Sequence, residues 1–194
     1  MKHLIKLILL INTILVLILS TSHLQDRDYA KISAKHIVQI HTMTGMGTGF
    51  YIRYKAKTYL VTNAHVCGHS NVIKTVDGLH KVLKLSDKVD LCLIENTREH
   101  GLPLAYTALQ SLDKVIVTGY PLGQPITSRI GRAVGMHQGY YLISVSVFGG
   151  NSGSPVLNED GRVTGVISVG NVETNEDAGI VTREQLIVFL EANR

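Results

Sequence analysis

Twelve short strand-like runs set the strongest limit on what this chain can fold into. Each run is rich in β-branched or aromatic residues and is bounded by glycine, asparagine, aspartate or proline. The runs cover residues 36–43, 47–54, 58–63, 71–76, 80–85, 90–95, 114–120, 126–134, 140–147, 154–158, 162–169 and 178–182. Many short strands separated by turn signals predict an all-β sandwich or barrel.

The runs divide evenly around residues 96–113, a segment without strand alternation. We therefore expect two similar β halves, about 36–95 and about 114–182, joined by a linker over 96–113. Only the end of the chain has the pattern of a helix, over about 183–192, and Thr182 can cap it. One face of that helix carries its apolar residues, Leu186, Ile187 and Leu190.

Residues 1–22 have the form of a secretory signal peptide. Two lysines precede an apolar stretch at 7–19, and Ser20 and Ser22 have the spacing that a signal peptidase needs. The alternative is an uncleaved membrane anchor, although 13 helical residues span only about 20 Å of a hydrocarbon core of about 30 Å. We expect a secreted, periplasmic or otherwise extracytoplasmic protein, with anchoring through this segment as the alternative.

Charge and cysteine content exclude several classes of protein. The net charge is +4, but beyond residue 22 seventeen basic residues face fifteen acidic ones, which leaves +2. There is also no basic run with interleaved aromatics, so nucleic acid is not an expected partner. Two cysteines are too few for a disulfide-stapled miniprotein or a four-cysteine zinc site.

The strongest chemical signal is the stretch Phe148-Gly-Gly-Asn-Ser-Gly-Ser-Pro-Val156. Glycines on both sides of Ser152 cost backbone entropy, which is justified where the chain must bend sharply beside another molecule. Amide N–H groups in such a turn can converge on one point and stabilise an oxyanion. The structural alternative is a glycine-rich β-turn without chemical meaning.

Two further motifs each carry one candidate side chain. His65 is expected at the end of a hydrophobic strand in Leu60-Val-Thr-Asn-Ala-His-Val-Cys67, and Asp90 begins the apolar strand in Val89-Asp-Leu-Cys-Leu-Ile94. Taken singly, the histidine is more often structural, and the aspartate is more often a simple strand start. Together with Ser152, however, they supply the hydroxyl, base and orienting acid that nucleophilic catalysis needs.

With these residues in the order His, Asp, Ser, the chain resembles a chymotrypsin-fold (trypsin-like) serine protease, and within that group the HtrA/Deg-type protease domain. The resemblance covers nearly all of residues 30–194. It is carried by the motifs Gly47-Thr-Gly-Phe50, Val61-Thr-Asn-Ala-His65, Asp90-Leu-Cys-Leu-Ile94, Gly119-Tyr-Pro-Leu-Gly123, Gly149-Gly-Asn-Ser-Gly153 and Gly165-Val-Ile-Ser-Val-Gly170. It implies two six-stranded antiparallel β-barrels with the active site between them, closed by the short C-terminal helix.

The resemblance also assigns roles. It makes Ser152 the nucleophile, His65 the general base and then acid, and Asp90 the carboxylate that orients the imidazole. The backbone N–H groups of Gly150 and Ser152, with Asn151 nearby, are expected to form the oxyanion hole. Cleavage would proceed through an acyl-enzyme and need no cofactor. The competing reading is a catalytically silent, protease-like binding module.

Substrate contacts are expected from five residues of the second half. The hydroxyl of Ser168 would support the triad acid, and the backbone of Ser168, Val169 and Gly170 would pair with an extended peptide. Ser146 and Phe148 would line the main specificity pocket. None of these residues is acidic, so we expect cleavage after a small or medium apolar residue, with a polypeptide as the partner.

Cys67 and Cys92 lie two residues past His65 and Asp90, so they come together if the triad forms. They are then either a disulfide, favoured by an oxidising compartment, or two small buried thiols. His65, Cys67 and His69 also alternate like metal ligands. One of these is already assigned to the triad and no fourth ligand is evident, so no metal is expected.

Rivals exist for each role. Another carboxylate, histidine or serine could replace a triad member: Asp77, Asp87, Asp113, His41, His69 or Ser154.

The chain also departs from the pattern of the family that it resembles. Asn151 stands where digestive enzymes have an aspartate that a new N-terminus neutralises, so activation by propeptide cleavage is not expected. No PDZ-like segment follows, which argues against oligomeric quality control of the HtrA type, and the oligomeric state stays open.

Overall fold

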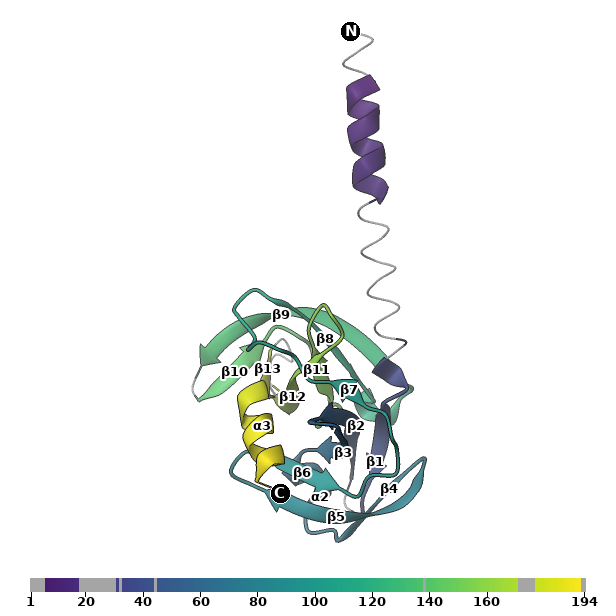
Figure 1. Ribbon diagram of the computed structural model, residues 1–194, viewed down its shortest axis with the longest axis vertical. Helices are drawn as coiled ribbons and strands as arrows, with labels where there is room; N and C mark the ends of the chain where they lie inside the picture. Colours follow the sequence, from purple (N-terminus) through teal and green to yellow (C-terminus); the bar gives the residue numbers. More distant parts are fainter. Residues whose placement is uncertain are drawn as a thin grey trace.

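The computed structural model describes residues 6–17, 31, 33–43, 45–137, 139–170 and 177–192. From residue 37 onward the chain forms two β-barrels that lie side by side, with one helix packed across them near the C-terminus (Figure 1). The predicted fold of two six-stranded antiparallel barrels with a short C-terminal helix is confirmed.

Barrel one contains the first six strands. They are β1 (Ile37–His41), β2 (Met46–Tyr54), β3 (Lys57–Thr62), β4 (Val72–Thr75), β5 (Gly78–Ser86) and β6 (Leu91–Ile94). Their order is β1-β4-β5-β6-β3-β2, and pairing of β1 with β2 closes the sheet. Alternating apolar side chains fill the interior, among them Ile40, Tyr51 and Leu60. The segment predicted as a linker adds one short strand, β7 (Leu102–Pro103), parallel to β2.

Barrel two contains the other six. They are β8 (Lys114–Gly119), β9 (Thr127–His137), β10 (Tyr140–Ile143), β11 (Pro155–Leu157), β12 (Val163–Gly170) and β13 (Ala178–Thr182). They close in the order β10-β13-β12-β11-β8-β9. The order keeps β12, which carries the predicted substrate edge, between β11 and β13.

One strand is shorter than predicted. The run 140–147 was expected to be a single strand, but β10 ends at Ile143. Its register with β9 shifts at Leu142, and the Val145 N–H donates to Ile143 O at 3.0 Å in a tight turn. A turn this tight takes the chain out of the sheet, so residues 144–147 lie outside β10.

An apolar core joins the two barrels to helix α3 (Arg183–Glu191). It includes Phe50 and Leu91 from barrel one, Ile116 and Val166 from barrel two, and Leu186 from the helix, all at most 1% exposed. Burial of large aliphatic and aromatic side chains of this kind contributes about 1.5–3 kcal/mol each. The core therefore fixes the position of one barrel against the other.

Helix α3 begins as predicted. The Thr182 side chain accepts a hydrogen bond from the Gln185 N–H, and the Gln185 side chain accepts one from the Thr182 N–H at 2.8 Å. This reciprocal capping box satisfies two N–H groups that the helix cannot pair internally. Of the predicted apolar face, Leu186 and Leu190 are buried, whereas Ile187 is only half-buried.

The N-terminal segment is described only over residues 6–17, which form an exposed helix. Among the described residues, no helix is both long and apolar enough to cross a bilayer. The predicted cleavage positions Ser20 and Ser22 lie outside the described residues.

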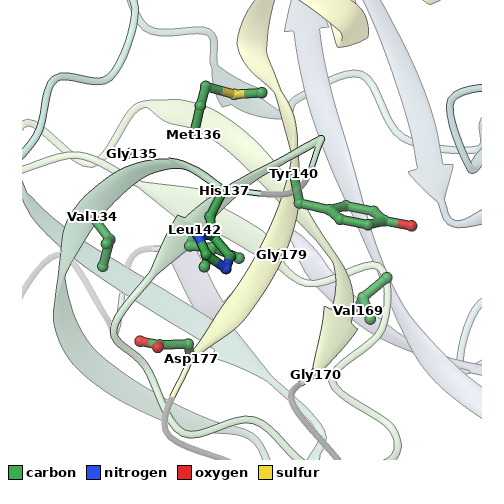
Figure 2. Close-up of a pocket in the computed structure, with 10 residues that line it drawn as sticks. All are labelled: Val134, Gly135, Met136, His137, Tyr140, Leu142, Val169, Gly170, Asp177 and Gly179. Atoms are coloured by element: carbon green, nitrogen blue, oxygen red, sulfur yellow. The ribbon is translucent and has the colours of Figure 1, made fainter.

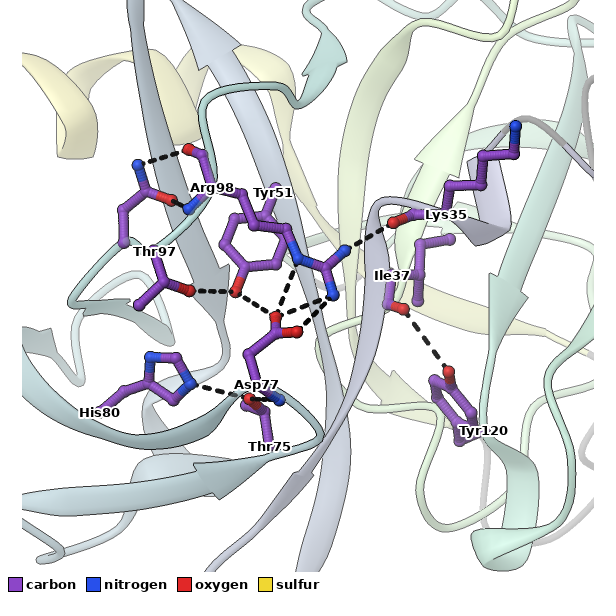
Figure 3. Close-up of polar contacts among 10 residues, drawn as sticks. Lys35, Ile37, Tyr51, Thr75, Asp77, His80, Thr97, Arg98 and Tyr120 are labelled. Atoms are coloured by element: carbon purple, nitrogen blue, oxygen red, sulfur yellow. Dashed lines mark hydrogen bonds and ion pairs between the residues drawn. The ribbon is translucent and has the colours of Figure 1, made fainter.

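A polar cluster ties the segment before β1 to barrel one (Figure 3). Arg98 forms a bidentate ion pair with Asp77: Nε and one terminal nitrogen each donate a hydrogen bond of 2.8 Å to a different carboxylate oxygen. The other terminal nitrogen donates to Lys35 O at 2.6 Å, and the guanidinium stacks 4.6 Å from the ring centre of Tyr51. The Tyr51 hydroxyl donates to Asp77 at 2.9 Å. One ion pair therefore organises three chain segments.

The ion pair also sets the protonation of its acid. The hydrogen bonds from Arg98 lower the pKa of Asp77 below its ordinary value of 3.8, and they outweigh partial burial, which acts in the opposite direction. Because the folded pKa lies below the unfolded one, Asp77 stabilises the fold above about pH 4. That stabilisation is lost as the pH falls through the lowered value.

Replacing Asp77 by asparagine should therefore lower the free energy of unfolding by about 1–3 kcal/mol at pH 7, because Arg98 loses its charged partner. Urea titrations from pH 7 to pH 2 measure the effect. The gap between wild type and D77N should narrow below about pH 4. D160N, which removes the same charge from an exposed turn, should leave the curve unchanged. A constant gap at all pH values would contradict the assignment.

Candidate active site

His65 lies on a four-residue helix, α2 (Ala64–Cys67), and not at the end of a strand as predicted. Strand β3 ends at Thr62, the buried Asn63 occupies the N-cap position without a side-chain capping bond, and Gly68 ends the helix in the left-handed region at φ +54°. The Asn63 side-chain amide donates to Asp90 O at 3.0 Å. The residue that starts the helix thereby also holds the acid opposite His65.

The side chains of His65 and Asp90 are in hydrogen-bond contact. The imidazole Nδ1 lies 3.0 Å from each carboxylate oxygen of Asp90, and the His65 N–H donates to Oδ1 at 3.1 Å. The Ser168 hydroxyl donates to Oδ2 from β12. About half of the imidazole surface is exposed, against about a quarter of the Asp90 side chain. The carboxylate orients the ring and leaves its other nitrogen toward solvent.

The surroundings of Asp90 keep it ionised. Burial by itself raises its pKa, but hydrogen bonds from the His65 ring, the Ser168 hydroxyl and the His65 N–H together outweigh burial and lower the pKa below the ordinary 3.8. Asp90 also has a positive φ of +50°. Aspartate tolerates this conformation better than most residues. A backbone outlier at a half-buried charge is typical of functional positions.

A disulfide joins the two segments that carry this pair. Cys67 at the end of α2 bonds to Cys92 in β6, with an S–S distance of 2.10 Å. Of the two alternatives left open by the sequence, the structure contains the disulfide. Cys67 is therefore not free to act as a metal ligand beside His65.

The loop around Ser152, the predicted nucleophile, depends on glycine at two positions. Gly150 and Gly153 have φ values of +92° and +84°. A Cβ at Gly150 would lie 2.4 Å from Tyr120 O, and one at Gly153 would lie 2.1 Å from Thr48 O. Only glycine fits either position without displacing main-chain atoms. Ser152 stands between these two constraints.

Two N–H groups of this loop are available for an anion. Among the backbone hydrogen bonds of the described residues, the N–H groups of Gly150 and Ser152 have no carbonyl partner. The Asn151 N–H, in contrast, donates to Phe148 O at 3.0 Å. Of the three residues expected to form the oxyanion hole, Asn151 is thus committed elsewhere, and two unpaired donors are left.

The loop lies against the helix that carries His65. Gly47 sits between them: a Cβ there would touch the Val66 side chain at 2.6 Å and Ser152 O at 3.2 Å. Among the described contacts, no hydrogen bond joins Ser152 Oγ to the imidazole. Such bonds are often long without substrate and tighten in the reacting complex.

Among the described residues, the edge of β12 beside the site has no pairing strand. On one side, β12 pairs with β13 along Gly165–Gly170, whereas its pairing with β11 stops at Val166. Ser168–Gly170 therefore presents unpaired main-chain groups toward the cleft. Val169 is 43% exposed there.

Two hollows flank this edge. A cleft of about 620 Å³ contains His65, Asp90, Ser168 and Val169. A second pocket of about 490 Å³ lies beyond it, with Tyr140 and Val169 lining both. Figure 2 shows the His137 ring and the Asp177 carboxylate turned toward the second pocket. Together they form an extended depression next to the imidazole.

The predicted specificity wall has an alternating pattern. Val145 and Val147 are buried in barrel two, whereas Ser146 and Phe148 are half-buried. The guanidinium of Arg129 stacks 5.2 Å from the ring centre of Phe148. No acidic side chain belongs to this wall.

The rival candidates do not converge on the site. Asp77 is bound by Arg98, Asp113 accepts the Gln110 N–H at 2.8 Å, and Ser154 is fully buried. Asp87 lines the cleft wall, but its carboxylate makes no hydrogen bond or ion pair with His65 among the described residues.

Sequence reasoning missed the contribution of Thr48. This residue lies at the centre of the motif Gly47-Thr-Gly-Phe50, which carried the family resemblance without an assigned role. Its side chain and main chain bond to three segments near Ser152. The motif was the only sequence signal for this role. The hydrogen-bond partners of Thr48 are more than ten residues away in sequence, so no local pattern reveals them.

Comparison with known proteins identifies relatives. A family model, Trypsin-like peptidase domain, matches residues 47–166. The chain is 31% identical over 153 residues to the serine protease Do-like HtrA of Bacillus subtilis, covering 66% of this chain and 34% of that protein. It is 33% identical over 138 residues to a probable periplasmic serine endoprotease DegP-like of Chlamydia muridarum, covering 62% and 27%. The chain thus spans about a third or less of these relatives' length.

Among solved structures, the active form of the Rv3671c protease from M. tuberculosis superimposes with a TM-score of 0.74. The match covers 87% of this chain and 85% of that one, at 22% identity. At this identity the likeness concerns the fold. The resemblance to trypsin-like and HtrA/Deg-type domains expected from the motifs is confirmed by these matches.

The disulfide generates a prediction. The bond closes a separation of 25 residues, and in the chain-entropy picture a loop of this size stabilises the fold by about 3 kcal/mol. The double variant C67A/C92A should lose about that much in urea titration. The NMR signals of the His65 ring should also shift in position, because α2 and β6 are no longer joined. Reduced wild type, with both thiols confirmed by mass, is the control and should behave like the variant.

Proposed function

We propose that this chain, which belongs to the family of trypsin-like peptidase domains, is a serine endopeptidase that cleaves peptide bonds through an acyl-enzyme. One observation carries the proposal. An imidazole held by a half-buried carboxylate lies on a helix that packs, across Gly47, against the loop of a glycine-flanked serine, and that loop has two N–H groups without a carbonyl partner among the described residues.

In the proposed reaction, Ser152 Oγ attacks the scissile carbonyl while His65 Nε2 takes its proton. Asp90 accepts the Nδ1–H and stabilises the imidazolium. The developing oxyanion accepts hydrogen bonds from the N–H groups of Gly150 and Ser152, and loss of one such donor typically costs about 10²–10³ in turnover. The imidazolium then protonates the leaving amine, and water repeats the sequence on the ester.

The proposed substrate is an extended polypeptide. It adds a strand to the free edge Ser168–Gly170, so main-chain hydrogen bonds provide affinity and side-chain pockets provide selectivity. Its residue before the cleaved bond would contact Ser146 and Phe148. Because no carboxylate lies in that wall, a small or medium apolar residue fits better than arginine or lysine.

We also propose that the protein works outside the cytoplasm. The support is the signal-like or anchor-like segment 1–22, together with the periplasmic description of the Chlamydia relative. A disulfide beside the site agrees with an oxidising compartment. No cofactor enters the proposed chemistry.

The function is tested with a fluorophosphonate probe, which reacts only with an activated serine. Wild type should be labelled, and S152A should not. The matched control is S154A, because Ser154 is a buried neighbour whose hydroxyl has no hydrogen-bond partner in the described part of the chain, and its labelling should persist. A folded wild-type sample that resists the probe would instead support the silent binding module.

Specificity has its own test. In a library of peptides that vary at the residue before the cleaved bond, alanine, valine and other small or medium apolar residues should give the highest kcat/KM. Mass spectrometry of the products, with S152A as background, identifies the cleaved bond. A strong preference for arginine or lysine would contradict the proposed pocket.

A further inference from the structure

The direction of the Gly150 N–H is set from outside its own loop. The carbonyl of the same peptide unit, Gly149 O, accepts a hydrogen bond from the Leu122 N–H at 2.6 Å. In a trans peptide the C=O and N–H point in opposite directions, and the described residues contain no cis bond. Fixing Gly149 O on Leu122 therefore turns the Gly150 N–H away from Leu122. Leu122 has a φ of +53°, a conformation that is strained for a non-glycine residue.

The next peptide unit is held in the same way, by a side chain. Gly150 O accepts a hydrogen bond from the Thr48 hydroxyl at 2.7 Å, and the Asn151 N–H donates to Phe148 O at 3.0 Å. With both ends bonded, this unit cannot rotate freely. It lies between the two peptide units whose N–H groups, those of Gly150 and Ser152, are unpaired.

The Thr48 hydroxyl has a defined orientation. It accepts the Tyr120 N–H at 3.1 Å, and that group can only donate. The single hydroxyl proton is therefore available for Gly150 O. Thr48 is fully buried, so water does not compete for either contact. Its β-branched side chain has few rotamers to lose.

The main chain of Thr48 anchors the hydroxyl. Its N–H donates to Ser152 O at 2.8 Å, and its carbonyl accepts the Thr62 hydroxyl at 2.6 Å. Thr48 thus connects β2 and β3 of barrel one with the nucleophile loop and the 119–123 turn of barrel two. The described structure has no other side chain that bonds to Gly150 O.

We propose that Thr48 is a positioning residue for the oxyanion hole: its hydroxyl holds the Gly150–Asn151 peptide unit so that the two flanking N–H groups face the reacting carbonyl. This inference rests on the proposed protease function. Thr48 does not touch the substrate. It acts through the peptide unit, so its contribution is greatest when negative charge develops on the carbonyl oxygen.

The test compares T48V, which keeps shape and removes the hydroxyl, with T48S, which keeps the hydroxyl. T48V should lower kcat about 10–100-fold on a peptide substrate, somewhat less than the loss of a whole oxyanion donor, and change KM less than about threefold. T48S should restore most of kcat. T48A replaces T48V if the valine variant does not fold.

The matched control is T118V. Thr118 is equally buried, and its hydroxyl bonds Ser128 at 2.8 Å, away from the loop. T118V should lose stability with wild-type kcat. If T48V and T118V both keep kcat at equal stability loss, or if T48S is as slow as T48V, the inference is overturned.

A second measurement does not depend on turnover. Amide hydrogen exchange followed by NMR should show the Asn151 N–H exchanging at least tenfold faster in T48V/S152A than in S152A, because its peptide unit is released. Unchanged exchange would overturn the inference. A wild type that hydrolyses no peptide would refute the proposed function, and the exchange data would still decide the role of Thr48.

Discussion

The apolar core between the two barrels is the constraint on which the candidate site depends. His65 and Asp90 belong to barrel one, whereas Ser152 and Ser168 belong to barrel two. No local pattern can place them together. The side chains of Phe50, Ile116 and their neighbours are buried between the barrels, so the relative position of the barrels is fixed by burial, which is strong but not directional.

Polar contacts supply the direction that burial lacks. Across the contact between the barrels, the Ser168 hydroxyl reaches Asp90, and Thr48 reaches Gly150 and Ser152. Each bond joins groups that would cost free energy if they were buried without a partner. Formation of the site and correct packing of the barrels are therefore the same event.

Two carboxylates with lowered pKa values show how different roles can share one electrostatic signature. The pKa of Asp77 is lowered by a bidentate arginine that ties down the segment before β1. The pKa of Asp90 is lowered, against its burial, by a histidine and a serine at the cleft. A perturbed pKa alone does not separate structure from chemistry. The group bonded to the carboxylate separates the two roles, because an imidazole can exchange protons near neutral pH and a guanidinium cannot.

Local patterns accounted for most of the elements. All twelve strand-like runs contain a strand, and Thr182 caps the final helix as expected. Two details differ from the prediction. Strand β10 ends early, where its register shifts against β9 and the Val145 N–H turns back to Ile143 O. His65 lies on a single turn of helix that the hydrogen bond from the Gly68 N–H to Ala64 O closes. A register shift and a four-residue helix are too short to alter the periodicity of a sequence window.

By itself, the sequence determined the all-β class, the two-part division and the residues available for chemistry, because side-chain periodicity and turn residues act over a few positions. Only the tertiary structure decided where those residues point. Gly150 and Thr48 are 102 positions apart, yet one hydrogen bond between them holds a peptide unit of the loop around Ser152. The Asn151 N–H likewise has a defined direction, because it donates to Phe148 O. The direction of a peptide unit is set by the hydrogen-bond partners that folding brings to it. The residues next to it in sequence do not identify those partners.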